Sequence, residues 1–213
     1  MAQNAPPIVL SANAFEKIAP AAYHRRFFAR NLRPDSRHFS DFRGTSVQIN
    51  SVTTAYGSAV VRMGSTMVIC GIKGEVAQPD VNFPDRGYFV PNIELSPVAS
   101  TDFSPGTPSE LAQVLSYRLD QVVREGGLLD LTQLCIEEKA AVWTLYADVT
   151  VLAYDGNVFD AALLALQTAL LYTKLPRAQF DTDTSIVTVT KELIQPILIR
   201  RRVYAASFAY FTE

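Results

Sequence analysis

The residues around Asn157 come closest, by their types and spacing, to a site for chemistry. The stretch AYDGNVFDAALLALQTALLYTKLP (153–176) predicts the end of a strand, a tight turn and a long apolar helix. A helix that opens after such a turn can hold a phosphate, because its first N–H groups lack partners and its dipole is positive there. The opening residues Asn157, Val158, Phe159 and Asp160 bring no hydroxyl, ammonium or guanidinium group. The predicted backbone therefore permits an anion site that the side chains do not complete.

Three carboxylates bracket this strand, turn and helix: Asp148, Asp155 and Asp160. A carboxylate here can bind a metal or act as a general acid. A structural interpretation competes with that one, because Asp155 and Gly156 are a turn pair and Asn157 is a good N-cap. Asp160 would then be the acid of a capping box, which we favour over catalysis. An acidic first turn also repels an incoming phosphate by about 1 kcal/mol or more at short range.

The other reactive side chains do not form a known catalytic or metal-binding pattern. His24 and His38 are the only histidines, and the sequence has no HxxH, HExxH, paired CxxC, GxSxG, Walker A or GxGxxG pattern. We therefore expect no metal and no cofactor. Cys70 and Cys135 lie in apolar surroundings without CxxC spacing, which predicts reduced, buried thiols in an intracellular protein.

Composition indicates a folded protein with an uneven charge. The chain has 213 residues, of which 48% are hydrophobic and 19% charged, with a net charge of −2. We expect a flexible leader over 1–14, one domain over 15–213, and no signal peptide or membrane span. Through Arg43 there are seven Lys/Arg and three Asp/Glu. This basic start suits a polyanion or an acidic partner, although arginines on a solvated helix face are the commoner explanation.

After the first helix, the predicted order is three or four strands, a helix, a strand, a helix and two strands. This order is typical of an α+β or mixed-sheet fold and not of a doubly wound one. Helices are expected from Pro20 to about residue 32, from Ser109 to Gly126, and from Asn157 to just before Pro176. A loop is expected from Ser96 to Pro108. Strands are expected over 46–52, 57–63, 66–76, 87–95, 140–156, 185–190 and 203–211.

Four segments, taken in order, resemble the RNase PH family. LRPDSRHFSDFR (32–43) is similar to the family's Arg-Pro-Asp-Gly-Arg opening, with Ser36 where glycine is usual. GSAVVRMGSTMVICGIKGEV (57–76) is similar to its next hairpin. PSELAQVLSYRLDQVV (108–123) and YDGNVFDAALLALQTALLYTKLP (154–176) are similar to its two long helices. Each motif is loose alone, but the ordered set is specific.

The resemblance is strongest to the RNase PH-like ring subunits of the eukaryotic RNA exosome, in the non-catalytic branch of fungal ribosomal-RNA-processing type. It implies an RNase PH-like fold, with mixed sheets packed against two long helices. It also implies a hexameric ring of paralogous RNase PH-like subunits, S1/KH cap proteins, a separate hydrolytic nuclease, and RNA in a central channel. The localisation implied is the nucleus and nucleolus, and also the cytoplasm.

Departures from the family pattern imply that this subunit is not an enzyme. Active members of the family carry a Gly-Gly-Ser/Thr-Arg motif that holds phosphate, where this chain has Gly156, Asn157, Val158 and Phe159. We therefore expect a degenerate phosphate site at Asn157 and Val158, no catalytic residue, and a scaffolding role in 3′-to-5′ RNA processing and degradation. The family's catalytic aspartate, C-terminal strands and last helix are expected to lie beyond Glu213.

The resemblance also suggests structural and RNA-contacting residues. The structural residues would be Arg33, Asp35, Arg37 and Asp160, with Asp35 pairing with nearby arginines and pinning the first helix to the sheet. The candidates for RNA contact are Arg118, Arg124 and Lys73. Two alternatives remain open at this point: an active phosphate-dependent 3′ exoribonuclease, and an unrelated α+β RNA-binding module that uses the basic N-terminal face.

Overall fold

The computed structural model describes residues 11–211, which divide into a unit that ends at Arg43 and a unit that begins at Gly44. The first unit contains helices α1 (Ala12–Ile18) and α2 (Pro20–Phe28), and neither helix has a buried residue. Residues 1–10 of the expected leader lie outside the described residues, and the rest of it contains the start of α1.

Helix α2 follows the sequence prediction, because Pro20 occupies its first turn and its aromatic residues pack on one another. The rings of Tyr23 and Phe27 meet edge to face at 5.0 Å. The helix ends at Phe28, before the chain enters the loop that contains Pro34. The described part of the first unit therefore has two short helices with ring contacts among their aromatic residues, and no buried core.

The second unit is built on a mixed sheet in the order β1-β2-β3-β6-β4. Strand β4 runs parallel to β6, and the other neighbouring pairs are antiparallel. This arrangement confirms the predicted α+β class with a mixed sheet. The strands are β1 (Thr45–Ile49), β2 (Gly57–Met63), β3 (Thr66–Ala77), β4 (Tyr88–Leu95) and β6 (Ala141–Ala153), and short β5 (Cys135–Glu137) pairs with β6.

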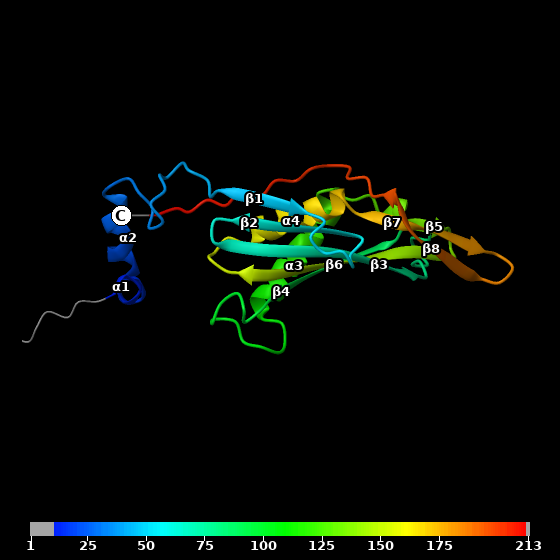
Figure 1. Ribbon diagram of the computed structural model, residues 1–213, viewed down its shortest axis with the longest axis horizontal. Coiled ribbons are helices and arrows are strands. Elements are labelled where there is room, and N and C mark those ends of the chain that lie inside the picture. The colour runs from blue at the N-terminus through cyan, green and yellow to red at the C-terminus, as the bar shows by residue number, and fades with distance from the viewer. Residues whose placement is uncertain (1–10, 212–213) are drawn as a thin grey trace, which may run out of the picture. The chain divides into compact units, whose positions relative to one another are not determined.

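One face of the sheet carries the core, because alternate side chains of each strand point to opposite faces. In β3 the side chains of Val68, Cys70 and Ile72 are fully buried, and Lys73 is exposed. Helices α3 (Glu110–Glu125) and α4 (Val158–Leu171) both lie behind the strands in Figure 1. Helix α4 packs on β2 and β3, and α3 packs on β4. The two long helices thus cover the same apolar face.

Helix α3 begins as the sequence predicts, because the Ser109 hydroxyl accepts a hydrogen bond from the Ala112 N–H at 3.2 Å. Its apolar residues are not all buried. Leu115 and Leu119 are buried, whereas Leu111 and Val114 are exposed. A short 3₁₀ turn (Leu131–Leu134) then leads into β5.

Strand β2 approaches α4 closely at Gly57. A Cβ atom built on Gly57 would lie 2.3 Å from the Thr173 hydroxyl and 2.7 Å from the Ala169 carbonyl oxygen. Thr173 is fully buried, and its hydroxyl donates to the same Ala169 carbonyl at 2.7 Å. The missing side chain of Gly57 therefore sets how near the C-terminal end of α4 comes to the sheet.

The region after α4 corrects two predictions. The helix ends at Leu171, before the predicted end, and strand β7 (Lys174–Asp181) runs through Pro176 to pair with β8 (Ile186–Pro196). The β7–β8 register shifts on both sides of Pro176, which is how a strand accommodates a residue without an N–H. The predicted strand over 203–211 is wrong, because these residues belong to no strand.

The sequence predicts reduced, buried cysteines and no membrane span. Both cysteines are free; Cys70 is buried as predicted, and Cys135 is only half-buried. Burial raises the pKa of the Cys70 thiol, and the charge of Asp148 raises it further, so Cys70 is a poor nucleophile. None of the helices among residues 11–211 is long and apolar enough to cross a membrane.

Candidate functional site

The turn between β6 and α4 is fixed in place by the first residue of strand β3. The buried hydroxyl of Thr66 donates to the Gly156 carbonyl at 2.8 Å and accepts from the Asp155 N–H at 3.1 Å. Gly156 has a φ of +74°, a conformation that glycine adopts without strain. Asp155 and Gly156 thus form a bend, in keeping with the expected turn pair, and present the next four residues at the start of α4.

The capping box predicted here is wrong in its hydrogen bonds. Asn157 occupies the N-cap position with φ 53° and ψ 43°, in the left-handed region, and its side chain caps no backbone N–H. A capping side chain needs an extended backbone to turn back on the helix, which this conformation does not provide. The Asn157 amide instead donates to the Asp160 carboxylate at 2.9 Å. Asp160 is only 8% exposed, so this bond helps to stabilise a buried carboxylate.

A second partner of Asp160 comes from the C-terminal segment over 197–211. The Ser207 hydroxyl lies 3.0 Å from both the Asp160 Oδ1 and the Asn157 Oδ1 atoms. It has one proton and so donates to one of these oxygens at a time. Further along α4, the buried Gln167 side chain accepts a hydrogen bond from the Val203 N–H at 2.8 Å. The segment therefore lies along α4 and covers the helix opening.

Sequence reasoning missed Ser207 and Gln167. Gln167 is a polar residue inside an otherwise apolar helix, and that placement was the available signal that it needs a buried partner. Ser207 gave no signal, because its role depends on contact with residues 47 and 50 positions away.

The chemistry open to this cluster is narrow. The polar atoms of the cluster belong to the buried Asp160 carboxylate and to the amide and hydroxyl of two exposed residues, Asn157 and Ser207. No lysine or arginine in the described chain donates to Asp160. A carboxylate near 4 Å from an incoming anion opposes it by about 1 kcal/mol in water and by more where water is excluded. Residues 11–211 contain no group of three or more His, Cys, Asp or Glu side chains placed to hold a metal ion. Asn157 and Val158 thus lie in a cluster held together by internal hydrogen bonds.

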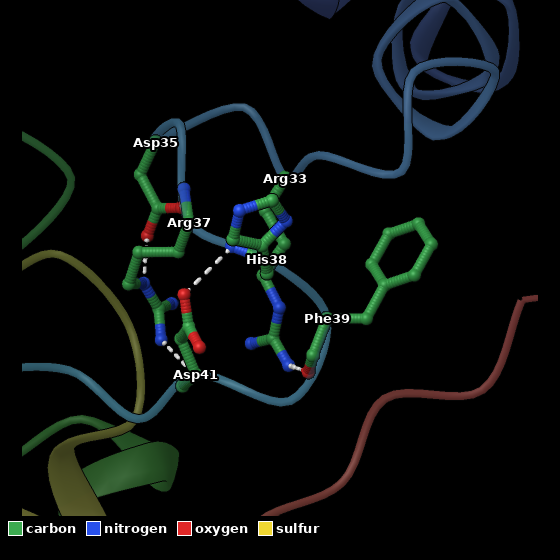
Figure 2. Close-up of polar contacts among 6 residues, drawn as sticks. All are labelled: Arg33, Asp35, Arg37, His38, Phe39 and Asp41. Carbon is green, nitrogen blue, oxygen red and sulfur yellow. Dashed lines mark hydrogen bonds and ion pairs between the residues drawn. The ribbon is translucent and has the colours of Figure 1, made fainter.

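Three of the predicted structural residues, Arg33, Asp35 and Arg37, lie in a hydrogen-bonded loop of the first unit, which Figure 2 shows. The Arg37 guanidinium contacts the Asp35 carboxylate at 2.7 Å and donates to the Asp41 carbonyl, also at 2.7 Å. The Arg33 guanidinium donates to the Phe39 carbonyl, and the His38 N–H donates to the Asp41 carboxylate at 3.0 Å. The expected pairing of Asp35 with an arginine is present. Its role in pinning the first helix to the sheet stays a prediction.

The Arg37 contacts explain the acidity of Asp35. Partial burial raises the pKa of its carboxyl, but the side-chain and backbone hydrogen bonds from Arg37, with the charges of Arg37 and Arg43, lower it by more. The net result is a pKa below the ordinary value for aspartate. Asp35 therefore stays ionised and holds the loop closed at neutral pH.

The three candidates for RNA contact lie in different environments. Arg124 forms an ion pair with Asp120 at 2.7 Å on α3, which uses part of its charge internally. Arg118 is exposed and lines an open groove of about 460 Å³ between α3, the start of α4 and Val203. Lys73 is exposed on the opposite face of the sheet from the helices. The structure thus does not bring Lys73 together with the arginines, and a role of all three in RNA contact stays a prediction.

Comparison with known proteins gives a consistent result. A family model described as the 3′ exoribonuclease family, domain 1, of RNase PH type matches residues 41–176. The match begins after the Arg33–Arg37 motif and includes both long helices.

Two relatives illustrate the similarity in sequence. The exosome complex component rrp43 of Schizosaccharomyces pombe is 43% identical over 93% of this chain and 74% of its own length. The exosome complex component Rrp42 of Methanothermobacter thermautotrophicus is 38% identical over 83% of this chain. This chain spans 65% of that archaeal relative's length.

Two solved structures share the fold. One is the Archaeoglobus fulgidus exosome with RNA bound to the active site, with a TM-score of 0.69 and 39% identity over 73% of this chain and 61% of that one. The other is an archaeal exosome core, with a TM-score of 0.63 and 35% identity over 73% of this chain and 58% of that one. These matches confirm the predicted RNase PH-like fold.

Proposed function

Because this chain belongs to the RNase PH-type 3′ exoribonuclease family, we propose that it is an exosome ring subunit that supports 3′-to-5′ RNA processing and degradation without cutting RNA itself. Its similarity to relatives named as exosome components supports the place in the ring. The arrangement at the start of α4 supports the absence of catalysis, and it is the observation on which the proposal depends.

That arrangement leaves no donor set for inorganic phosphate. The side chains of Val158 and Phe159 offer no polar hydrogen, and Asp160 places a buried negative charge in the first turn of α4. The Ser207 hydroxyl, which could donate to an anion, lies against Asp160 and Asn157 instead. A phosphorolytic enzyme needs hydroxyl and cationic groups aimed at the attacking phosphate, because catalysis rests on positioned donors. This cluster instead provides a negative charge, which repels phosphate.

The partners follow from the same assignment. We propose that paralogous RNase PH-like subunits complete a hexameric ring with this chain, that S1/KH proteins cap it, and that RNA passes through its channel to a separate hydrolytic nuclease. The proposed localisation is the nucleus and nucleolus, and also the cytoplasm. In this assignment the chain supplies a wall of the channel.

The alternative is an active phosphate-dependent 3′ exoribonuclease, which the description of the family favours. The two functions differ in one measurement. Rings would be assembled from this chain and its RNase PH-like paralogues, with all of the paralogues carrying substitutions that abolish any activity of their own. RNA and inorganic phosphate are then added, and nucleoside diphosphates are measured.

We expect intact rings that contain this chain, by native mass spectrometry, and no release of nucleoside diphosphates when this chain is the only unsubstituted subunit. The same release assay is run with rings that contain the Asp160→Asn variant as the matched control. This substitution removes the negative charge at the α4 opening and keeps the side-chain size. Release from a ring in which only this chain is unsubstituted would overturn the absence of catalysis. Failure to join any ring would overturn the scaffold role.

A further inference from the structure

The loop between β4 and α3 concentrates a dipeptide pattern that the proposed function does not use. The chain has twelve prolines, and three of them follow a serine or threonine. All three pairs lie within 13 residues of this one loop: Ser96–Pro97, Ser104–Pro105 and Thr107–Pro108. Proline fixes its own φ and pushes the preceding residue toward an extended backbone. Proline-directed protein kinases recognise a serine or threonine that directly precedes a proline, so each pair is a candidate site on sequence grounds.

The structure separates these three hydroxyls into two kinds. Ser96 is half-buried, and its hydroxyl accepts a hydrogen bond from the Val98 N–H at 3.3 Å in a tight turn. Ser104 and Thr107 are exposed, as are the prolines that follow them. Among the described residues, neither of these two side chains forms a hydrogen bond. The same dipeptide thus occurs once in a folded turn and twice in accessible chain.

In the described part of the chain, neighbouring hydroxyls in the same loop do form hydrogen bonds, unlike those of Ser104 and Thr107. The Ser100 hydroxyl contacts the Asp102 N–H and carboxylate at 3.2 Å, and the Ser109 hydroxyl caps α3. These side chains are engaged in holding the ends of the loop. The segment between them, from Ser104 to Thr107, includes Gly106 with a φ of +120° and contains no helix or strand.

We propose that Ser104 and Thr107 are a pair of phosphorylation sites for a proline-directed serine/threonine kinase, and that Ser96 is not a site. In each transfer the side-chain Oγ atom attacks the γ-phosphorus of ATP, and a new O–P bond forms. The bond between that phosphorus and the β–γ bridging oxygen breaks, ADP leaves, and the hydroxyl proton passes through the kinase base to solvent. This inference does not depend on whether the chain cuts RNA or joins a ring.

The added charge would act locally. A phosphate on Thr107 would lie two residues before the N-cap Ser109, where a negative charge favours the positive end of helix α3. Arg118 lies eight residues into that helix, about 12 Å along its axis at 1.5 Å per residue. That separation exceeds the Debye length of about 8 Å at physiological ionic strength, so the charge at Arg118 is largely screened from the loop. The phosphate thus acts mainly on the start of α3. Because it stabilises the positive end of this helix, we expect slower hydrogen exchange in the first turn after phosphorylation.

The test uses the full chain, a purified proline-directed kinase and ATP, with intact-mass and peptide mass spectrometry. We expect two phosphoryl groups, at Ser104 and Thr107. The variant Ser96→Ala should take up as much phosphate as the unsubstituted chain, and the double variant Ser104→Ala/Thr107→Ala should take up none. The double variant Pro105→Ala/Pro108→Ala keeps both hydroxyls and should lose most of the uptake.

Each contrary result is decisive. Phosphate on Ser96, no uptake by a chain that circular dichroism shows to be folded, or full uptake by the Ser104→Ala/Thr107→Ala variant would overturn the proposal. All substituted residues are in the loop and only Ser96 makes a side-chain hydrogen bond, so folding is expected to survive in each variant. The same peptide mapping on chain isolated from cells, with and without phosphatase treatment, tests whether the two sites are used there.

Discussion

Asp160 is the residue on which the start of α4 depends most. Its carboxylate is 8% exposed and accepts from the Asn157 amide and the Ser207 hydroxyl. The substitution Asp160→Asn keeps the size but turns an acceptor into a donor that faces another donor. We expect the free energy of unfolding to fall by about 1–3 kcal/mol, the cost of a lost hydrogen bond to a buried charged group. Urea denaturation measures this change.

Asp120 provides the matched control. It also accepts one strong hydrogen bond, from Arg124 at 2.7 Å, but the Arg124 side chain is half exposed and the pair lies one helical turn apart on α3. Asp120→Asn should therefore change the stability by no more than about 0.5 kcal/mol. Equal effects at the two aspartates would contradict the structural importance of Asp160.

The Asp35–Arg37 pair leads to a prediction about pH. The folded-state pKa of Asp35 lies below its unfolded value, so its contribution to stability is present above the unfolded pKa and is lost as the pH falls through the folded pKa. In Arg37→Gln, partial burial still raises the pKa while the ion pair and its hydrogen bonds are gone. We expect the Asp35 carboxyl to titrate at higher pH in this variant, by NMR. An unchanged titration would show that the pair is not formed in solution.

The sequence predicted the residues of this site better than it predicted their contacts. The spacing of Asn157 and Asp160 marks both as residues of the helix start, and the residue types of Val158 and Phe159 show that neither carries a hydroxyl or cationic side chain. The capping box failed because a left-handed backbone at Asn157 is set by the turn after Gly156, and propensity does not encode it. Ser207 could not be found, because the contact that gives it a role is tertiary.

At the scale of the elements, close approach between β2 and α4 gives the sharpest prediction. The added methyl group of Gly57→Ala would lie 2.3 Å from the Thr173 hydroxyl and 2.7 Å from the backbone, so the helix or the strand must move. We expect a loss of about 1–3 kcal/mol in the free energy of unfolding, as for other overpacked cores. Chemical denaturation with circular dichroism provides the measurement.

Gly71→Ala on the neighbouring strand β3 is the control for this substitution. A Cβ atom there would lie 3.7 Å from the Ala55 side chain, which is an ordinary contact. It should be neutral, or stabilising by about 0.4–1 kcal/mol because the unfolded chain loses freedom. A comparable loss at Gly71 would point to a general intolerance of strand substitutions and against the close approach at Gly57.

The elements that the sequence predicted share strong local signals. Strands β2, β3 and β6 are rich in β-branched and apolar residues, and α3 has a serine cap, so these are close to their predicted places. The sequence does not predict strand β7, because Pro176 is typical of the end of a helix, whereas the strand accommodates it with a register shift. The segment over 203–211 has a strand-like sequence, but it forms no strand, and its Val203 N–H bonds to the Gln167 side chain of α4.

At the scale of the whole molecule, the two units differ in how much they bury. The described residues up to Arg43 include no buried side chain, whereas the unit from Gly44 contains the hydrophobic core. Regions with few buried apolar contacts open locally at low free-energy cost. Trypsin should therefore cut first after Arg25, Arg26 and Arg30, and the sheet should remain intact. Mass spectrometry of a limited digest tests this, and early cleavage at Arg62 in β2 would contradict it.

The place of β6 in the sheet has a consequence for synthesis. Strand β3 ends at Ala77, and its partner β6 begins only at Ala141, after β4 and α3 have been made. A ribosome that adds 5–20 residues per second takes roughly 3–12 s to cover the ~60 residues between them. During that time β3 offers an unpaired apolar edge to any other nascent strand. We therefore expect the yield of unaggregated protein to depend on chaperones that bind the nascent chain during translation.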